Sequence, residues 1–455
     1  MEALRHTGAL LRHMLRRERF GLAVWIAASA ALCASVAAAL PALYPDEADR
    51  QLAAAAMQNP AVIAIAGIPY GTDRFTYGAM FAQQMLLFVG TVFGVLNILM
   101  VVRLTRAEEE HGRLEMIRSL PVGRLAPLHA AMLAALAANA AAGAAAAGAA
   151  AALGIESIDF RGSLVFGAAA ASAGIVFAAW TALIAQLAGT ARGALGGAIG
   201  LLAAAYVLRA LGDAGAEAWS WASPLGWITR TKAYVENDWR PLLLSAGVSL
   251  AALAAAYALY GVRDLGSGLL PARPGRRRAS ALLRGPLGLA WRLQRTGWIA
   301  WAVGVFLSGA AYGSILGDLD AFLADNEMLL KFLPEAAGRP MTDLFVARLW
   351  TILAMISVVP PLTAMLRLKG EEERGRVEPV LASGVSRHRM FGGYLLLSGV
   401  SAFAMLSLSA FGLILAADAV LEGGVPAADW YGSALAYLPA NAAMVGAAAF
   451  FAGRM

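Results

Sequence analysis

The chain has 455 residues, of which 60% are hydrophobic and only 15% are charged, and its formal net charge is +6. Soluble domains carry roughly 25% charged residues, so this composition excludes an ordinary soluble fold. The chain contains one cysteine, which excludes a disulfide framework and a multi-cysteine metal site.

Long apolar runs recur along the whole sequence. Each is close to the roughly 20 residues that a helix needs to cross a hydrocarbon core about 30 Å thick. We therefore expect an all-α fold, a polytopic transmembrane helical bundle with about ten spans. In chain order the predicted spans are 21–41, 79–102, 126–154, 163–187, 193–211, 242–261, 297–317, 344–366, 391–417 and 431–452.

The distribution of basic residues predicts the orientation. With the N-terminus in the cytoplasm, most of the 36 lysines and arginines fall in cytoplasmic segments, which is the usual bias of membrane proteins. The basic stretch Arg5 to Arg19 leads into a full-length span, so it is not a cleavable signal. We predict a multi-pass plasma membrane protein. The run Arg276 to Arg278 suits anionic lipid headgroups as well as nucleic acid, so no nucleic-acid partner is expected.

A dense charged segment occurs twice. EEEHGRLEMIRSLPVGR begins at Glu108 and EEERGRVEPVLASGVSR begins at Glu371, an ungapped offset of 263 residues (371 − 108). Because the first half holds an even number of spans, we predict two parallel six-span repeats. The expected organisation is a first half at 1–262, a basic linker with an amphipathic helix at 263–296, and a second half at 297–455. The second half lacks counterparts of the fifth and sixth spans, and we expect a truncated chain.

The repeated segments favour a protein-docking role. On a continuous helix, Glu109 and Arg113 would form a surface pair, while Glu108 and Glu115 would share a face without a partner. The second segment repeats both relationships. Acids that only aid solubility are the alternative, but an idle loop need not keep so dense a match. The candidate docking residues are Glu108, Glu109, Glu110, Arg113, Glu115, Glu371, Glu372, Glu373, Arg376 and Glu378.

The sequence contains no HExxH, GxSxG or GxxxxGK[ST] motif, which disfavours metalloprotease or serine hydrolase chemistry and nucleotide binding. The repeated acids stand among arginines in a solvent-exposed segment, which disfavours a catalytic role for them. No Asp, Glu or His lies near the middle of a predicted span, which disfavours coupling to an ion gradient. The polar residues inside spans are expected to form interhelical hydrogen bonds, with lining of a substrate path as the alternative. The candidates for the path are Gln83, Gln84, Asn97, Asn139 and Asn441.

Two copies of EEExGRxE, each between the second and third spans of its half, resemble permeases of the type-two ATP-binding cassette exporters. More narrowly, they resemble the fused exporters of polyketide antibiotics, the tetronasin-exporter type. The resemblance implies coupling helices near 104–120 and 367–383 that dock on two copies of a separate ATPase subunit. It implies that ATP and Mg bind that partner, with no cofactor on this chain. The chain itself would be a non-enzymatic permease that exports hydrophobic or amphiphilic compounds such as antibiotics, drugs or lipids.

The resemblance also implies connecting helices, while Pro379 departs from the family pattern and the glycines are interpreted from the residues themselves. Leu10 to Phe20 would be an amphipathic connecting helix at the inner membrane surface, with Leu282 to Arg295 as its counterpart. Pro379 disfavours helical geometry at Glu378, so the second coupling helix is expected to end earlier than the first. Two overlapping GxxxG pairs, Gly193 with Gly197 and Gly196 with Gly200, predict close helix contact in the fifth span. An ion-gradient-driven secondary drug transporter is the alternative function, and a membrane scaffold or lipid-modifying enzyme is a third.

Overall fold

The computed structural model describes residues 2–58, 60–215, 217–270, 278, 280, 283, 285–318, 341–421 and 424–453. The chain divides into two compact units, Met1–Pro274 and Gly275–Met455. Within the described ranges every regular element is a helix and no strand occurs, which confirms the all-α prediction.

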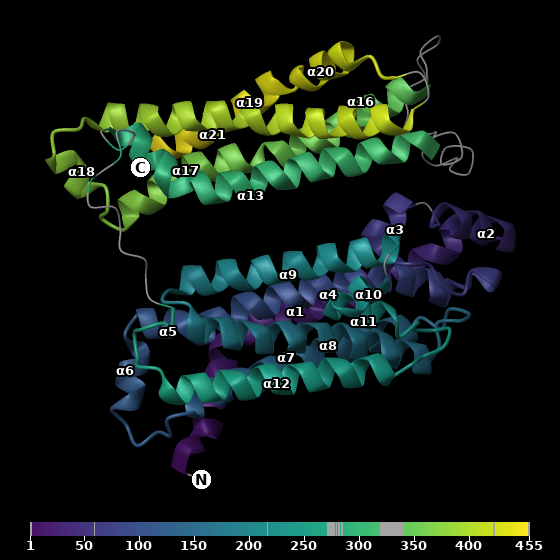
Figure 1. The fold of residues 1–455 in the computed structure, drawn as a ribbon, viewed down its shortest axis with the longest axis horizontal. Coiled ribbons are helices and arrows are strands. Elements are labelled where there is room, and N and C mark those ends of the chain that lie inside the picture. Colours follow the sequence, from purple (N-terminus) through teal and green to yellow (C-terminus); the bar gives the residue numbers. More distant parts are fainter. Residues whose placement is uncertain are drawn as a thin grey trace. The chain divides into compact units, whose positions relative to one another are not determined.

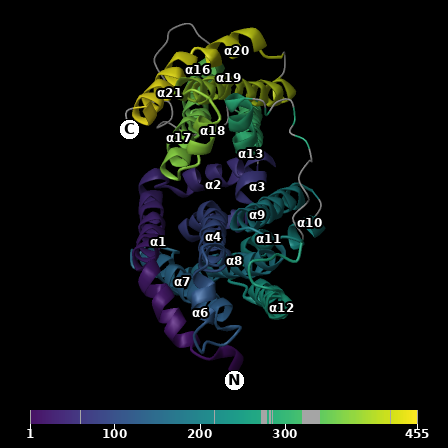
Figure 2. The ribbon, with the colours of Figure 1, turned by 90° about the vertical axis from the view of Figure 1, so that its left-hand side faces the viewer.

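The first unit is a bundle of six long helices (Figure 1). They are α1 (Thr7–Leu43), α4 (Tyr77–Leu104), α7 (Ala126–Ala151), α8 (Phe160–Leu187), α9 (Ala191–Ala214) and α12 (Arg240–Val262). α1 packs along α7 at one edge of the unit (Figure 2). α8 contacts α4, α7, α9 and α12 and is the centre of the bundle. The shorter elements are η1 (Glu2–Leu4), α2 (Glu47–Ala56), α3 (Pro60–Ala66), η2 (Thr72–Arg74), α5 (Arg106–Glu110), α6 (Arg113–Arg118), α10 (Glu217–Trp221) and α11 (Pro224–Thr229).

Polar side chains mark where several of these helices begin. The Thr76 hydroxyl accepts a hydrogen bond from the amide of Ala79 at 3.3 Å at the start of α4. The Asp159 carboxylate accepts one from the amide of Gly162 at 3.0 Å at the start of α8, and Thr190 caps α9 in the same way. Each cap satisfies an amide that the first helical turn leaves unpaired.

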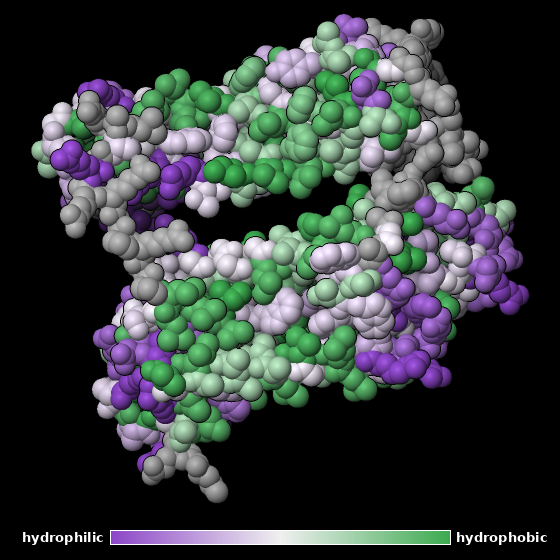
Figure 3. Space-filling view, viewed as in Figure 1, coloured by the Kyte–Doolittle hydropathy of each residue, from purple (hydrophilic) through white to green (hydrophobic). Residues whose placement is uncertain are grey.

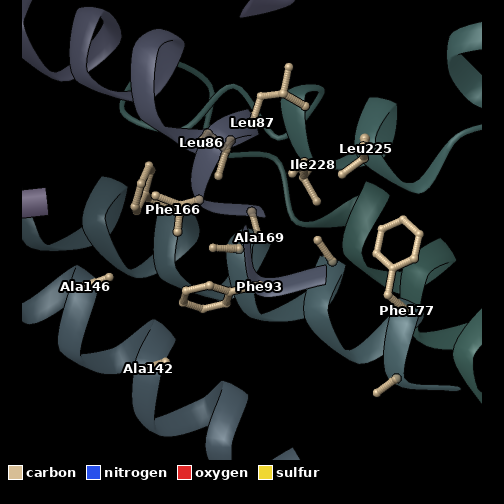
Figure 4. Packing of buried hydrophobic residues seen from close by; sticks show 14 of the residues in the cluster. Leu86, Leu87, Phe93, Ala142, Ala146, Phe166, Ala169, Phe177, Leu225 and Ile228 are labelled. Carbon is tan, nitrogen blue, oxygen red and sulfur yellow. The ribbon is translucent and has the colours of Figure 1, made fainter. Parts of the chain in front are cut away.

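Aromatic and small residues fill the centre of the first unit. Phe93, Phe166 and Phe177 are fully buried, and Figure 4 shows them between the packed helices. α7 and α8 approach most closely at two glycines, because a Cβ added to Gly143 would lie 2.5 Å from the carbonyl oxygen of Gly167. Glycine at this crossing allows the two backbones to come into contact.

The glycines of α9 make fewer close contacts than the sequence predicts. A Cβ added to Gly196 or Gly200 would meet no heavy atom within 4 Å. One added to Gly197 would meet only a side-chain methyl of Ile184. In the described part of the first unit, the predicted close approach to another helix is therefore present at Gly197, where the added Cβ would lie 3.1 Å from Ile184, and absent at Gly196 and Gly200.

The second unit contains α13 (Pro286–Ser314), η4 (Ile315–Asp318), α16 (Met341–Ser357), α17 (Val359–Glu373), α18 (Glu378–Ala382), α19 (Arg387–Val420), α20 (Ala427–Leu435) and α21 (Leu438–Gly453). α13 packs along α19, where a Cβ added to Gly313 would lie 3.1 Å from the side chain of Ala416. Two of its predicted spans are interrupted by a break before proline: α16 gives way to α17 before Pro360 and Pro361, and α20 to α21 before Pro439. Proline lacks the amide that would continue a helix and is tolerated in the first turn, which explains these breaks.

Nine helical segments of the described chain are long and apolar enough to cross a membrane. The predicted span 297–317 falls mostly in α13, which is not among the nine. In each unit, hydrophobic residues cover the middle of the bundle and hydrophilic residues gather toward its ends (Figure 3). This distribution is expected of helices that lie in lipid between two aqueous phases.

The predicted connecting helix is not a separate element. Leu10 to Phe20 is the first part of α1, which continues without interruption for 37 residues. At a rise of 1.5 Å per residue, such a helix is about 55 Å long, well beyond the hydrocarbon thickness. From Pro286 to Arg295, its proposed counterpart is likewise the beginning of α13. Residues 281, 282 and 284 lie outside the described residues.

Candidate functional site

Both charged segments change direction at a glycine. α5 ends at Glu110 and α6 begins at Arg113, and between them Gly112 has a φ of 69°. α17 ends at Glu373, 263 residues after Glu110 (373 − 110), and Gly375 then has a φ of 65°. This left-handed conformation favours glycine. The two segments therefore break at equivalent positions.

The break changes the predicted ion pairs. Arg113 does not face Glu109 on a continuous helix, because its Nε binds Glu108 at 3.0 Å. In the second segment Arg376 binds Glu371, with its Nη1 3.5 Å from the carboxylate. The predicted surface pairs four residues apart are wrong, and the structure replaces both with a pair five residues apart.

Pro379 does not shorten the second segment in the way predicted. α17 ends at the same relative position as α5, and α18 begins at Glu378 with Pro379 in its first turn. Proline is well suited to the first turn of a helix, where its missing amide has no partner to lose. The prediction of an earlier end is therefore wrong.

Glu108 points inward and is not available as an unpaired acid. Its side chain is buried, and it accepts a hydrogen bond from Nη1 of Arg17 at 2.9 Å in addition to its contact with Arg113. The same region of α1 carries Glu18, which is buried and bound by Arg103. These contacts connect α1 to the end of α4 and to the first charged segment.

Glu371 is buried in the same way in the second unit. Arg367 lies 3.7 Å from its carboxylate, in addition to Arg376. Glu372 is only partly buried and accepts a hydrogen bond from Arg387 at the start of α19. A cavity of about 260 Å³ lies beside this pair, lined also by His388 and Phe391.

Glu109 is the most extensively bound acid of the first segment. Both terminal nitrogens of Arg263 donate to its carboxylate, at 2.7 and 2.9 Å. Nη1 of Arg106 and the amide of Gly266 each donate to it at 2.8 Å. Burial by itself raises the pKa of this carboxyl, but the bonds from Arg263 and Gly266 and the two guanidinium charges hold the pKa of Glu109 below its ordinary value.

The arginines around Glu109 bind further elements. Nη2 of Arg106 donates to the carbonyl oxygen of Gly189 at 2.7 Å, and Nε of Arg263 donates to Oε1 of Gln186 at 3.1 Å. Both arginines are buried, at 1% and 6% exposed. Sequence reasoning named neither arginine as a site residue. Arg106 lies within the predicted coupling helix, three residues before Glu109, whereas Arg263 is 154 residues from Glu109 (263 − 109) and no local pattern marks it.

Other members of the candidate set face outward. Glu110, Glu115, Glu373 and Glu378 are exposed. Beside Glu115, Met116 and Leu120 are 65% and 59% exposed, which is unusual for large apolar side chains in a segment that is otherwise anchored inward. We call Glu115, Met116 and Leu120 the outward face of the first segment.

Two of the polar residues inside spans bind each other. Nδ2 of Asn97 donates to Oδ1 of Asn139 at 2.9 Å, and Nδ2 of Asn139 donates back to Oδ1 of Asn97 at 2.8 Å. Both side chains are fully buried, and Gly174 of α8 packs directly against them. The predicted interhelical hydrogen bond is therefore present between α4 and α7.

The remaining polar candidates differ from one another. Nε2 of Gln83 donates to the carbonyl oxygen of Gly67 at 2.7 Å and so holds the loop after α3. Gln84 is partly exposed. Asn441 is buried, and its Nδ2 has no hydrogen-bond partner in the described part of the chain.

Taken together, long apolar helices in both units with charged segments at their ends define a multi-pass helical membrane protein. A family model described as the C-terminal domain of multidrug efflux system permease Rv1217c matches residues 283–455. The chain is 37% identical over 414 residues to the multidrug efflux system permease protein Rv1217c of Mycobacterium tuberculosis. That alignment covers 90% of this chain and 74% of that protein. The chain belongs to this family of multidrug efflux permeases.

Proposed function

We propose that the chain is the permease subunit of an ATP-binding cassette exporter of type two. In this proposal it moves hydrophobic or amphiphilic compounds across the plasma membrane, using ATP that two copies of a separate ATPase subunit hydrolyse. The similarity to a multidrug efflux permease supports export of drug-like compounds. ATP and Mg would bind the partner, since the sequence holds no phosphate-binding loop.

The observation that carries the ATPase partner is the repeated geometry of the charged segments. Each segment breaks at a glycine with positive φ, and each folds an arginine back onto the glutamate five residues before it. The neighbouring helices are also paired alike, because α1 packs along α7 and α13 packs along α19. These correspondences support an internal duplication, with one docking segment in each half.

The docking surface follows from which residues face outward. Glu108, Glu109 and Glu371 are buried among arginines of this chain and are therefore anchors. The outward face of the first segment offers exposed apolar side chains beside an acid, a composition suited to a protein interface. In the second half, the counterpart of Glu115 is Glu378, which is also exposed. We propose that these outward residues contact the ATPase.

The proposed orientation places both charged segments and the N-terminus in the cytoplasm. The beginning of α1 carries several arginines that extend past the span, where anionic lipid would attract them.

For the substrate path we retain Gln84 and Asn441. Asn97 and Asn139 satisfy each other, and Gln83 is occupied by the loop after α3.

The test is a double substitution on the docking surface. Glu115→Lys together with Glu378→Lys should abolish copurification with the ATPase subunit, while membrane insertion remains normal. Glu156→Lys is the matched control, because Glu156 is an exposed acid in the loop between α7 and α8, at the other end of the same unit. If the double variant copurifies with the ATPase and exports a fluorescent drug like the parent, the docking assignment is wrong. If export by the parent continues after ATP is depleted but stops when a protonophore is added, the chain is instead an ion-gradient-driven transporter.

A further inference from the structure

In the first segment's EEE run Glu109 is buried, as Glu108 is, and it is not exposed to a partner protein. Its residue exposure is 7%, and its carboxylate is surrounded by donors of this chain. Burying an ion pair costs desolvation, and apolar residues of similar size often stabilise a fold as well or better. A buried network of this kind therefore calls for an explanation other than stability, such as holding its members in one fixed geometry.

The network joins segments that are far apart in the sequence. Arg106 and Glu109 belong to α5, Gln186 lies at the end of α8, and Gly189 precedes α9. Arg263 directly follows α12 and donates to Glu109 and Gln186. We call Arg106, Glu109, Gln186 and Arg263 the Glu109 joint.

Backbone and side-chain bonds outside the joint reinforce the same connection. The amides of Leu269 and Leu270, in the segment after α12, donate to the carbonyl oxygens of Gln186 and Leu187 at 3.1 and 3.0 Å. The exposed carboxylate of Glu110 accepts a hydrogen bond from the amide of Ala191 at 2.6 Å. The first charged segment is therefore tied to the ends of three long helices, α8, α9 and α12.

We infer that the Glu109 joint transmits force from the docking surface to α8, α9 and α12. Because Glu109 holds Arg263 in two parallel hydrogen bonds, α5 cannot be displaced without moving the end of α12. Glu109 and Arg263 act as positioning residues for coupling and do not contact the ATPase. This inference rests on the proposed function, since it assumes that a partner pushes on the outward face.

The experiment compares coupling with docking. Glu109→Gln keeps the size of the side chain but removes its charge, and Arg263→Lys keeps the charge but removes the paired geometry. In purified complexes reconstituted in vesicles, both variants should retain the ATPase subunit at parental stoichiometry. Ethidium transported per ATP hydrolysed should fall by about tenfold in Glu109→Gln and by less in Arg263→Lys.

The ratio of transport to hydrolysis separates coupling from a merely structural role. A variant that only misfolds lowers the amount of active complex but leaves this ratio unchanged in the molecules that remain. A parental ratio in Glu109→Gln, measured in complexes that retain the ATPase, would overturn the inference. The control Glu156→Gln lies outside the joint and should keep the parental ratio.

Failure of the proposed function has a different appearance. If no ATPase copurifies with the parent chain, or if the parent transports ethidium without ATP, the docking proposal itself fails. Loss of the ATPase subunit from Glu109→Gln would also overturn the inference, because it would make Glu109 part of docking and not of transmission.

Discussion

Arg263 holds the Glu109 carboxylate with both terminal nitrogens, although 154 residues separate the two in the sequence. The pair is almost entirely buried, with both side chains 4% exposed. It brings the beginning of the predicted linker against the first charged segment. The first segment is therefore an integral part of the first unit and not a loop that only meets solvent.

The first prediction concerns the stability of this pair. Glu109→Ala leaves two buried guanidinium groups without their carboxylate, and breaking a buried pair costs about 3 to 5 kcal/mol. The melting temperature of the detergent-purified chain should fall clearly. The double variant Glu109→Ala, Arg263→Ala should lose less than the sum of the two single variants, because one of the two stranded charges, that of Arg263, is gone while that of Arg106 remains. Additive losses would show that the two side chains are not energetically coupled.

The second prediction separates the two interpretations of the buried asparagines. Asn139→Ala leaves the amide of Asn97 without its partner, which should cost about 1 to 2 kcal/mol in unfolding. The KM for exported drug should not change, because the pair is enclosed by packed helices. Ser35→Ala is the control, since that exposed hydroxyl bonds only within α1. A variant of normal stability with an altered KM would restore Asn139 to the substrate path.

The third prediction concerns glycine packing between α7 and α8. Gly143→Ala introduces a methyl group 2.5 Å from the carbonyl oxygen of Gly167, so the helices must separate. Overpacking of this kind costs roughly 1 to 3 kcal/mol. Gly200→Ala, where the methyl meets nothing within 4 Å, should leave the free energy of unfolding unchanged or raise it slightly, because alanine favours a helix. Equal effects at both positions would contradict the assigned contact.

Hydropathy predicted the helices well because it is a local property. Every predicted span except the seventh falls in one of the nine membrane-length segments, apart from the last three residues of the span 126–154, and Cys33 inside the first span is fully buried. The breaks at Ser357 and Ala436 were missed because the residues around them are apolar, so hydropathy alone shows one uninterrupted span. In each case a proline lies in the first turn of the helix that follows the break. A scan for proline inside a predicted span could have found both.

The charged segments were harder to predict because their partners are distant in the sequence. The repeated motif places Glu371 where the first segment has Glu108, and each of the two glutamates pairs with the arginine five residues after it. The direction in which each charged side chain points could not be derived by assuming one continuous helix, because the chain bends at Gly112 between α5 and α6. One signal was present in the sequence: glycine directly after a charged helical run is a common helix end. Arg263 left no such signal.

The last prediction concerns the bend itself. Gly112 has a φ of 69°, and a Cβ added there would meet no atom within 4 Å, so any penalty comes from the backbone alone. Gly112→Asn should be tolerated, because asparagine adopts the left-handed conformation more readily than other residues. Gly112→Val should cost about 1 to 3 kcal/mol locally and release Arg113 from Glu108, because a β-branched residue resists this conformation.

Since the bend directs the outward face, Gly112→Val should weaken copurification of the ATPase while Gly112→Asn retains it. The same contrast is expected at Gly375, whose φ is 65°. If valine and asparagine behave alike at both positions, the bend does not orient the docking surface, and the outward residues must be presented by another part of the fold.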